Sequence, residues 1–352
     1  MKRTMYLTAA LLAAMTAATS CSDDNAAEVT GNPQEGLRVT SVGVSQDAET
    51  RAGITATSFT SGETLGLYIY RGTGIGDASK DYNGGAGLTA TVNVPYKEDN
   101  GTWSAAQPII LSSVQGKVYS YYPYAAGNST NDGTSIPVSV SAAQGTGQSD
   151  GTADAGQTDY MYGNVVSGIS NANSTVSLTM NHALAMVTFK FRQTDVTGKA
   201  YPGEGKVSAI TLRDATYGDI SNAVVRTGAG TMNIATGYVT VTGTAATGIT
   251  LAPDASSTLM DVTAADKLPR MLVYPHVSAI AAGQVVAVIT VDGSSYTLPL
   301  PALGTGYVRG NNYEYTFTMK GTEMEVTSVE ITPWVLNQMT GGDIQTPDPV
   351  AP

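Results

Sequence analysis

Apolar and polar residues alternate over many short stretches of this chain, which is the period of a β-strand with one buried face. The stretches that show it lie at 37–44, 65–70, 87–96, 116–124, 135–141, 159–163, 176–191, 207–214, 237–243, 271–276, 284–291, 295–301, 312–320 and 325–334. Turns rich in glycine and proline separate them, and no long amphipathic helix is evident. The pattern predicts an all-β chain of two antiparallel β-sandwiches in tandem.

Two dipeptides predict tight hairpins, and one segment is ambiguous. Asn100-Gly101 and Asp292-Gly293 each lie between two strand-like stretches, and Asn-Gly and Asp-Gly favour two-residue hairpin turns. The sequence "NHALAM" (181–186) suits either one helical turn or a continued strand. We expect it to continue into the strand "MVTFKF".

The first predicted strand, Leu37 to Val44, changes phase along its length. Leu37 and Val39 share one parity, whereas Val42 and Val44 share the other. Because successive strand residues face opposite sides of a sheet, this phase slip predicts a β-bulge.

Composition suggests where the units of the chain begin and end. A polar, acidic tether is expected over 21–36, a first sandwich over 37–170 and a second sandwich over 171–336. The last residues, 337–352, are rich in glycine and proline and are predicted to form a flexible tail.

The N-terminal 20 residues are predicted to be a signal peptide. Lys2 and Arg3 precede a short apolar run that ends in "ATSC", with Cys21 last. This ending resembles the lipobox of bacterial lipoproteins, in which the cysteine is acylated, and the following "SDD" looks like the export signal of Bacteroidetes surface lipoproteins. The alternative is an ordinary signal peptide followed by an unmodified cysteine.

Composition excludes several kinds of function. The net charge is −11 and no basic stripe exists, so a nucleic-acid role lacks its main source of affinity. With one cysteine and two histidines, neither an intrachain disulfide nor a zinc site of the Cys/His type can be assembled. We therefore expect no cofactor and no metal.

Candidate catalytic residues are few. No nucleophile elbow or zinc-protease motif occurs, and any triad would have to use His182 or His276. His182 lies among apolar residues, where a packed histidine is the more common role, so we do not expect an enzyme. A pair of carboxylates for glycoside hydrolysis is not excluded by sequence, because only their separation in space matters. The tyrosines of "YSYYPY" (119–124) leave a glycan-binding surface open as an alternative.

The order of these features resembles the fimbrillin family, the type V pilins and accessory subunits of Bacteroidetes. The features are the lipoprotein signal, the short first strand, the lone Arg51 before Ala52, two all-β units, the apolar-His-Ala segment and the final "ITPW". The resemblance spans nearly the whole chain. It implies two transthyretin-like β-sandwiches, a surface-exposed outer-membrane lipoprotein precursor and a subunit of a fimbrium.

The resemblance also implies how the subunit would assemble. An arginine-specific protease would cut after Arg51 and remove the lipidated peptide with the strand that carries Leu37, Val39, Val42 and Val44. A strand donated by another pilin subunit would then replace it. The donor is expected near the C-terminus, where Val329, Ile331, Val335 and Leu336 are the candidates. This C-terminal segment is a mediocre donor, so an anchor or tip subunit is the alternative.

Overall fold

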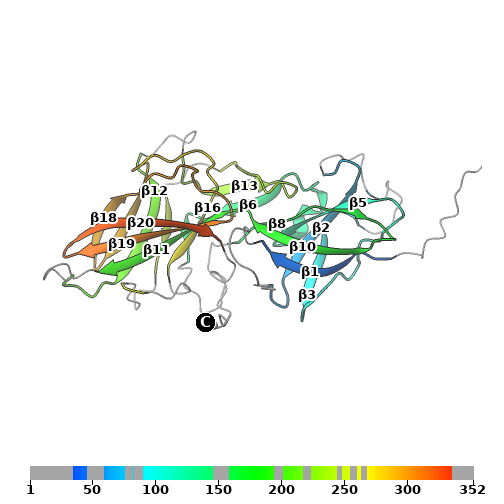
Figure 1. Cartoon of the computed structure of the whole chain (residues 1–352), viewed down its shortest axis with the longest axis horizontal. Helices are drawn as coiled ribbons and strands as arrows, with labels where there is room; N and C mark the ends of the chain where they lie inside the picture. The colour runs from blue at the N-terminus through cyan, green and yellow to red at the C-terminus, as the bar shows by residue number, and fades with distance from the viewer. Residues whose placement is uncertain are drawn as a thin grey trace, which may run out of the picture. The chain divides into compact units, whose positions relative to one another are not determined.

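A computed structural model of the chain describes residues 35–45, 59–75, 82, 90–145, 158–193, 201–216, 223–243, 248–253, 260–262 and 268–334. Within them the chain is all-β (Figure 1), and the one helix is a short 3₁₀ turn, Ala126–Thr130. No helix among the described residues is long and apolar enough to cross a membrane. The predicted all-β class is confirmed.

Twenty strands make up the described fold. They are β1 (Arg38–Val44), β2 (Thr64–Arg71), β3 (Val94–Asp99), β4 (Thr102–Ser104), β5 (Gly116–Tyr122), β6 (Ile136–Val140), β7 (Ala143–Gln144), β8 (Met161–Gly163), β9 (Val166–Ile169), β10 (Thr175–His182), β11 (Ala185–Gln193), β12 (Val207–Asp214), β13 (Gly228–Met232), β14 (Val239–Val241), β15 (Ile249–Leu251), β16 (Arg270–Val273), β17 (Val285–Val291), β18 (Ser294–Pro299), β19 (Asn311–Lys320) and β20 (Glu323–Pro333).

Both predicted hairpin turns are present. Asn100 and Gly101 connect β3 to β4 with φ of 50° and 87°, and Asp292 and Gly293 connect β17 to β18 with φ of 44° and 81°. Two successive residues with positive φ match the twist of the paired strands. The strand predicted at 87–96 is shifted, because the described residues 90–93 are not in a strand and β3 begins at Val94.

The first sheet closes on itself. Its strands run in the order β2-β3-β4-β1-β10-β8-β5, and β5 pairs back to β2, with β9 added beside β5. The apolar residues inside this ring form one core, with Leu65, Leu67 and Ile69 from β2 and Val176, Leu178 and Met180 from β10. β1 completes the ring, because its neighbours β4 and β10 are joined through it.

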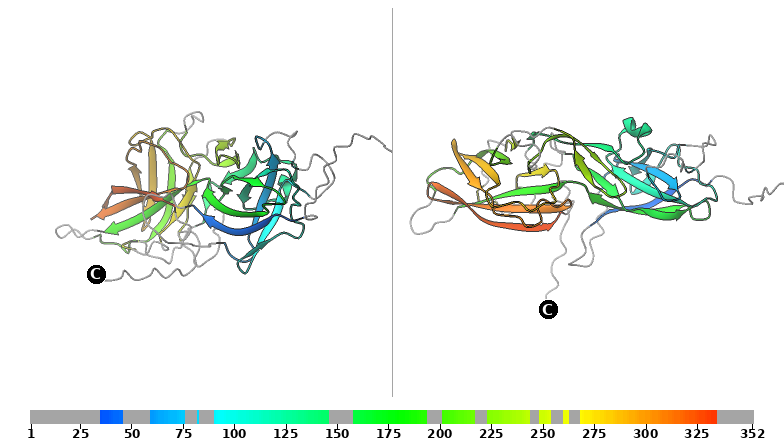
Figure 2. Two further views of the ribbon diagram at one scale, coloured as in Figure 1. Left: turned by 45° about the vertical axis from the view of Figure 1, so that its right-hand side comes forward. Right: turned by 90° about the horizontal axis from the view of Figure 1, so that it is seen from above.

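Two further sheets share a second core. One has the order β16-β11-β19-β20 and the other β18-β17-β12-β15-β7, and Figure 2 shows them as separate layers. Phe189 and Phe317 of the first layer belong to the same buried cluster as Ile210 and Ile289 of the second. A small sheet, β14-β13-β6, adds Val138 to that cluster.

Strand pairing does not follow the expected division at residue 170. β10 lies beyond that point in the sequence but pairs with β1 and β8 of the first sheet. β6 and β7 lie before it but pair with β13 and β15. The alternating buried residues of β6 (Ile136, Val138 and Val140) explain its placement, since they pack into the second core.

The segment 181–186 is neither a helical turn nor a continuous strand. β10 ends at His182, the chain bends at Ala183 and Leu184, and β11 begins at Ala185 in a different sheet. Both bend residues are fully buried, and the Ala183 N–H donates to the carbonyl of Tyr160 at 2.8 Å. The prediction that 181–186 continues as one strand was wrong. A short run of apolar residues indicates burial, but it does not determine the backbone conformation.

A glycine series tests the packing of the loop after β18. Gly306 has a φ of 67°, and a Cβ there would collide with the carbonyl oxygen of His276. We expect Gly306→Ala to lower the free energy of unfolding by about 3 kcal/mol, since strain and a backbone clash combine. Gly310→Ala, with φ of 74° but open space, should cost about 1 kcal/mol, and Gly304→Ala, which has neither constraint, should be near neutral. Urea unfolding measures all three, and equal costs would contradict the geometry.

Buried tyrosines predict a loss of stability in alkali. Burial raises the pKa of Tyr96, Tyr274 and Tyr315 to about 12, against about 10 in an unfolded chain. Their neutral form therefore contributes stability in full below about pH 10, and that contribution is lost as the pH approaches 12. The urea midpoint should fall steeply between these values while the tyrosinate absorbance rises with unfolding. Ionisation of these three buried tyrosines near pH 10, followed by residue-resolved NMR in a chain that keeps its native far-UV spectrum, would contradict this.

Candidate functional site

The candidate functional site is β1 together with the place between β10 and β4 that β1 fills in the first sheet. β1 runs parallel to β10, with Arg38 opposite Thr175 and Val44 opposite Met180. On its other side it meets β4 at one pair, Val39 with Trp103. β1 is thus held mainly by one neighbour.

The predicted bulge is present in β1 and explains the phase slip. The register shifts between Val39 and Ser41, so Thr40 is the extra residue of the bulge, and its hydroxyl donates to the Val176 carbonyl at 2.9 Å. Leu37 and Val39 before the bulge and Val42 after it are all buried, at 2%, 6% and 3% exposed. Val44 is half-buried against the same core. Burial of the three residues contributes on the order of 6 kcal/mol to holding the strand.

Polar contacts fix the start of β1. The Tyr96 hydroxyl donates to the Leu37 carbonyl at 2.9 Å and accepts from the Ile109 N–H at 3.3 Å. The Leu37 N–H donates to the Ile109 carbonyl at 2.8 Å. Tyr96 is 1% exposed, so its hydroxyl would be left without an acceptor if the strand moved away. Nothing in the sequence singled out Tyr96 for this role.

The far end of β1 is fixed to β10. The Ser45 N–H donates to the Met180 carbonyl at 2.6 Å, and the Ser41 and Ser177 hydroxyls are hydrogen-bonded across the pair. If β1 were removed, Val176, Leu178 and Met180 would face an open groove beside an unpaired strand edge. Such an edge is a template for a new strand, because its backbone groups and its apolar face both need partners.

Several predicted site residues lie outside the described residues. These are Cys21, Arg51 and Ala52 at the N-terminal side and Val335 and Leu336 at the C-terminal side. The segment 46–58, which connects β1 to β2 and carries Arg51, lies outside them as well. Lipidation at Cys21 and cleavage after Arg51 stay predictions.

The other two donor candidates belong to an established strand. Val329 and Ile331 lie in β20, which pairs antiparallel with β19 from Asn311–Pro333 to Lys320–Glu323. Ile331 is 47% exposed, and β20 is the edge strand of its sheet. Because β20 pairs with β19 from Asn311–Pro333 to Lys320–Glu323, a donor segment that leaves this pairing intact begins after Pro333.

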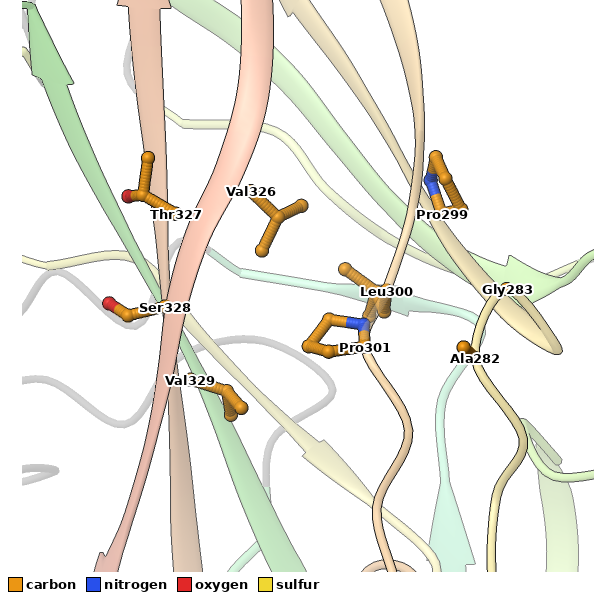
Figure 3. Close-up of a pocket in the computed structure, with 9 residues that line it drawn as sticks. All are labelled: Ala282, Gly283, Pro299, Leu300, Pro301, Val326, Thr327, Ser328 and Val329. Atoms are coloured by element: carbon orange, nitrogen blue, oxygen red, sulfur yellow. The ribbon is translucent and has the colours of Figure 1, made fainter.

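A shallow groove runs beside β20. Its volume is about 440 Å³, and Figure 3 shows Val326 and Val329 of β20 on one side and Leu300 and Pro301 on the other. β20 and β18 are both edge strands of their sheets. Pro299 and Pro301 have no backbone N–H, which limits strand addition on the β18 side.

The C-terminal end of β20 meets the end of β10 through an aromatic stack. The Trp334 ring lies 3.9 Å from the His182 ring at an interplanar angle of 9°. His182 is 3% exposed and its Nδ1 lies 2.9 Å from Asp159 Oδ1, while Trp334 is 1% exposed. His182 Nε2 and Trp334 Nε1 are both buried without a hydrogen-bond partner. The apolar neighbours of His182 in the sequence predicted a packed residue, and nothing in the sequence connects it with Trp334.

The remaining candidates for chemistry have structural surroundings. His276 is half-buried, and burial, together with the charge of Arg226, lowers its pKa. Tyr119 and Tyr121, which suggested a glycan surface, are buried at 3% and 1% exposed. The Tyr121 hydroxyl is enclosed by Asn93 and Asn128. Within the described part of the chain, no group of three or more His, Cys, Asp or Glu side chains could hold a metal ion.

Comparison with solved structures gives the same fold. A candidate cell adhesion protein from Bacteroides uniformis is 21% identical, with a TM-score of 0.57 over 86% of this chain and 99% of its own. Another from Bacteroides ovatus is 16% identical, with a TM-score of 0.60 over 87% of this chain and 99% of its own. Among curated proteins nothing matches.

The family assignment comes from the sequence match. The model of the fimbrillin-like family matches residues 50–334, which begin after β1 and end with Trp334. This range contains every described strand except β1. The chain therefore belongs to the fimbrillin-like family.

Proposed function

We propose that this protein is a structural subunit of a surface fimbrium that assembles by exchange of β1 for a strand of another subunit. The observation that carries the proposal is the placement of β1. It fills the apolar groove beside β10, yet it meets β4 at one residue pair and lies outside the family match. Membership of the fimbrillin-like family supports a place at the cell surface and contact with other pilin subunits.

The subunit is exported as a lipoprotein in this proposal. Acylation of Cys21 anchors the precursor in the outer membrane, since each buried CH₂ contributes about 0.8 kcal/mol. The "ATSC" and "SDD" sequences support it. In the precursor, β1 covers its own docking groove during export.

Proteolysis then starts assembly. An arginine-specific protease cuts after Arg51 and detaches the lipidated peptide with β1. The position of Arg51 supports this step, because it lies seven residues beyond Val44, between β1 and β2.

Strand exchange joins the subunits. A donor segment that begins after Trp334, with Val335 and Leu336, enters the vacated groove of the next subunit. Each subunit then accepts at one site and donates at another, so the contact is heterologous and builds a filament. The proposal includes the family architecture of two transthyretin-like sandwiches, with the closed first sheet as the accepting one.

The cleavage step predicts a new N-terminus. The subunits in assembled fimbriae should begin at Ala52, and N-terminal sequencing of purified fimbriae measures this. Arg51→Ala should abolish this product and keep the precursor in the membrane fraction, because the protease loses its recognition residue. Arg38→Ala is the matched control, since Arg38 lies in β1, and it should be processed normally. Assembled fimbriae whose subunits still begin at Cys21 would contradict the proposal.

The docking of β1 predicts which substitutions weaken it. Val42→Ser should loosen β1 by about 2 kcal/mol, since it exchanges a buried isopropyl group for a hydroxyl. The precursor should then show faster hydrogen exchange in β1 and β10 than in β19. Arg38→Ala removes an exposed ion pair with Glu35 and should change exchange little. Equal exchange in the two variants would show that the buried face of β1 does not hold it.

A further inference from the structure

β20 leaves part of the second core uncovered along its outer edge. Among the described strands, β19 is the only one that pairs with β20. The register places Val329 and Ile331 opposite two tyrosines of β19 that are fully buried. Val329 and Ile331 therefore point to the core side of the sheet, yet Val329 is half-buried and Ile331 is 47% exposed. Apolar side chains that belong to the core thus reach solvent at this edge.

The uncovered side chains border the groove of about 440 Å³ beside β20. Figure 3 shows Val329 on the side of the ribbon that faces Pro301, whereas Ser328 lies on the other side. The opposite wall carries Pro299 and Pro301, which have no backbone N–H to offer. An extended segment in the groove would therefore make its backbone hydrogen bonds with β20.

A bulge defines which part of this edge is regular. The register of β20 against β19 shifts once, so Thr327 is the extra residue, and its hydroxyl donates to the Thr316 carbonyl at 3.2 Å. A bulge twists an edge and hinders strand addition at that point. Beyond it, Ser328 to Pro333 form six regular residues, about 20 Å of strand.

The outward face of the same edge carries a carboxylate without a countercharge. Glu330 is exposed and lies directly opposite Glu314 of β19. Glu314 is already paired with Lys190 of β11 at 2.8 Å. No Lys or Arg among the described residues forms an ion pair with Glu330. Because like charges directly opposite each other destabilise a sheet, a cation beside Glu330 would be favourable.

We propose that the edge from Ser328 to Pro333 binds an extended, basic segment of another protein, which adds to the sheet as a strand beside β20. The residue of that segment opposite Glu330 is Lys or Arg. The two residues next to it are apolar, because they lie beside Val329 and Ile331 on the core side. β20 and β1 belong to different sheets, so this surface does not depend on the release of β1.

Charge argues against a second copy of this chain as the occupant. The net charge is −11, so two copies repel each other. The other edge strands of the described sheets are β6, β7, β9, β14, β16 and β18. Within these strands the one Lys or Arg is Arg270, which is 1% exposed and cannot reach a partner's edge. A protein with a basic strand therefore fits the edge better than this chain does.

The test follows the Val and Ile methyl groups of the full-length chain by NMR. The probe is a peptide with blocked ends, Thr-Thr-Val-Lys-Val-Thr-Thr, which reads the same in both directions and so suits a parallel or an antiparallel strand. We expect saturable shifts at Val329 and Ile331 and none at Val42 of β1. The same peptide with Glu at its centre should bind about fivefold more weakly, since repulsion from Glu330 replaces attraction.

A charge reversal on the protein should invert this preference. Glu330→Lys should bind the peptide with central Glu about fivefold more tightly than the peptide with central Lys. The variant should fold, because its new cation faces Glu314. Glu323→Lys is the matched control, since it changes the net charge equally on the same strand, about 23 Å away. It should keep the preference for the peptide with Lys.

Three results would overturn the proposal. No shift at Val329 and Ile331 shows that the edge accepts no strand. Equal binding of the peptides with central Lys and central Glu shows that charge does not select the occupant. Shifts of the same methyl groups when the chain is concentrated without peptide assign the groove to a second copy. None of these results bears on the exchange of β1, so the proposed function is tested separately.

Discussion

The pairing of β1 with β10 is the contact on which the first sheet depends. Through it the strands close into a ring, and through it Leu37, Val39 and Val42 reach the core. The buried side chains of β1 together contribute much stability, yet all of them lie within one short stretch of the chain. A single cut beyond residue 45 would therefore convert a covalent strand into a bound peptide.

The bulge at Thr40 reconciles the sequence of β1 with its burial. Without it, either Leu37 and Val39 or Val42 and Val44 would face outward. The irregularity also limits how well a regular strand can copy β1, since a donor without the bulge meets the groove in a different register. The energetics of exchange thus depend on how the incoming segment fits beside β10, in addition to its apolar content.

The local features of the fold could be predicted from the sequence, and the non-local ones could not. Alternation, the phase slip in β1 and the turns at Asn100-Gly101 and Asp292-Gly293 are properties of neighbouring residues, and each is present. The placement of β6 and β7 beside β13 and β15 depends on partners about a hundred residues away, which alternation does not encode. The bend at Ala183-Leu184 and the stack of His182 on Trp334 were missed for the same reason. The residues of β1 predicted a bulged strand, whereas its role as an exchangeable strand was implied by the resemblance to the fimbrillin family.

The account is tested most directly by locking β1 in place. Ser41 and Ser177 lie opposite each other on β1 and β10 with their hydroxyls in contact, so Ser41→Cys with Ser177→Cys can form a disulfide. The account predicts that oxidised double-cysteine protein is cut after Arg51 but forms no fimbriae, and that reduction restores assembly. Fimbriae formed from oxidised protein, with β1 still linked to β10, would contradict it.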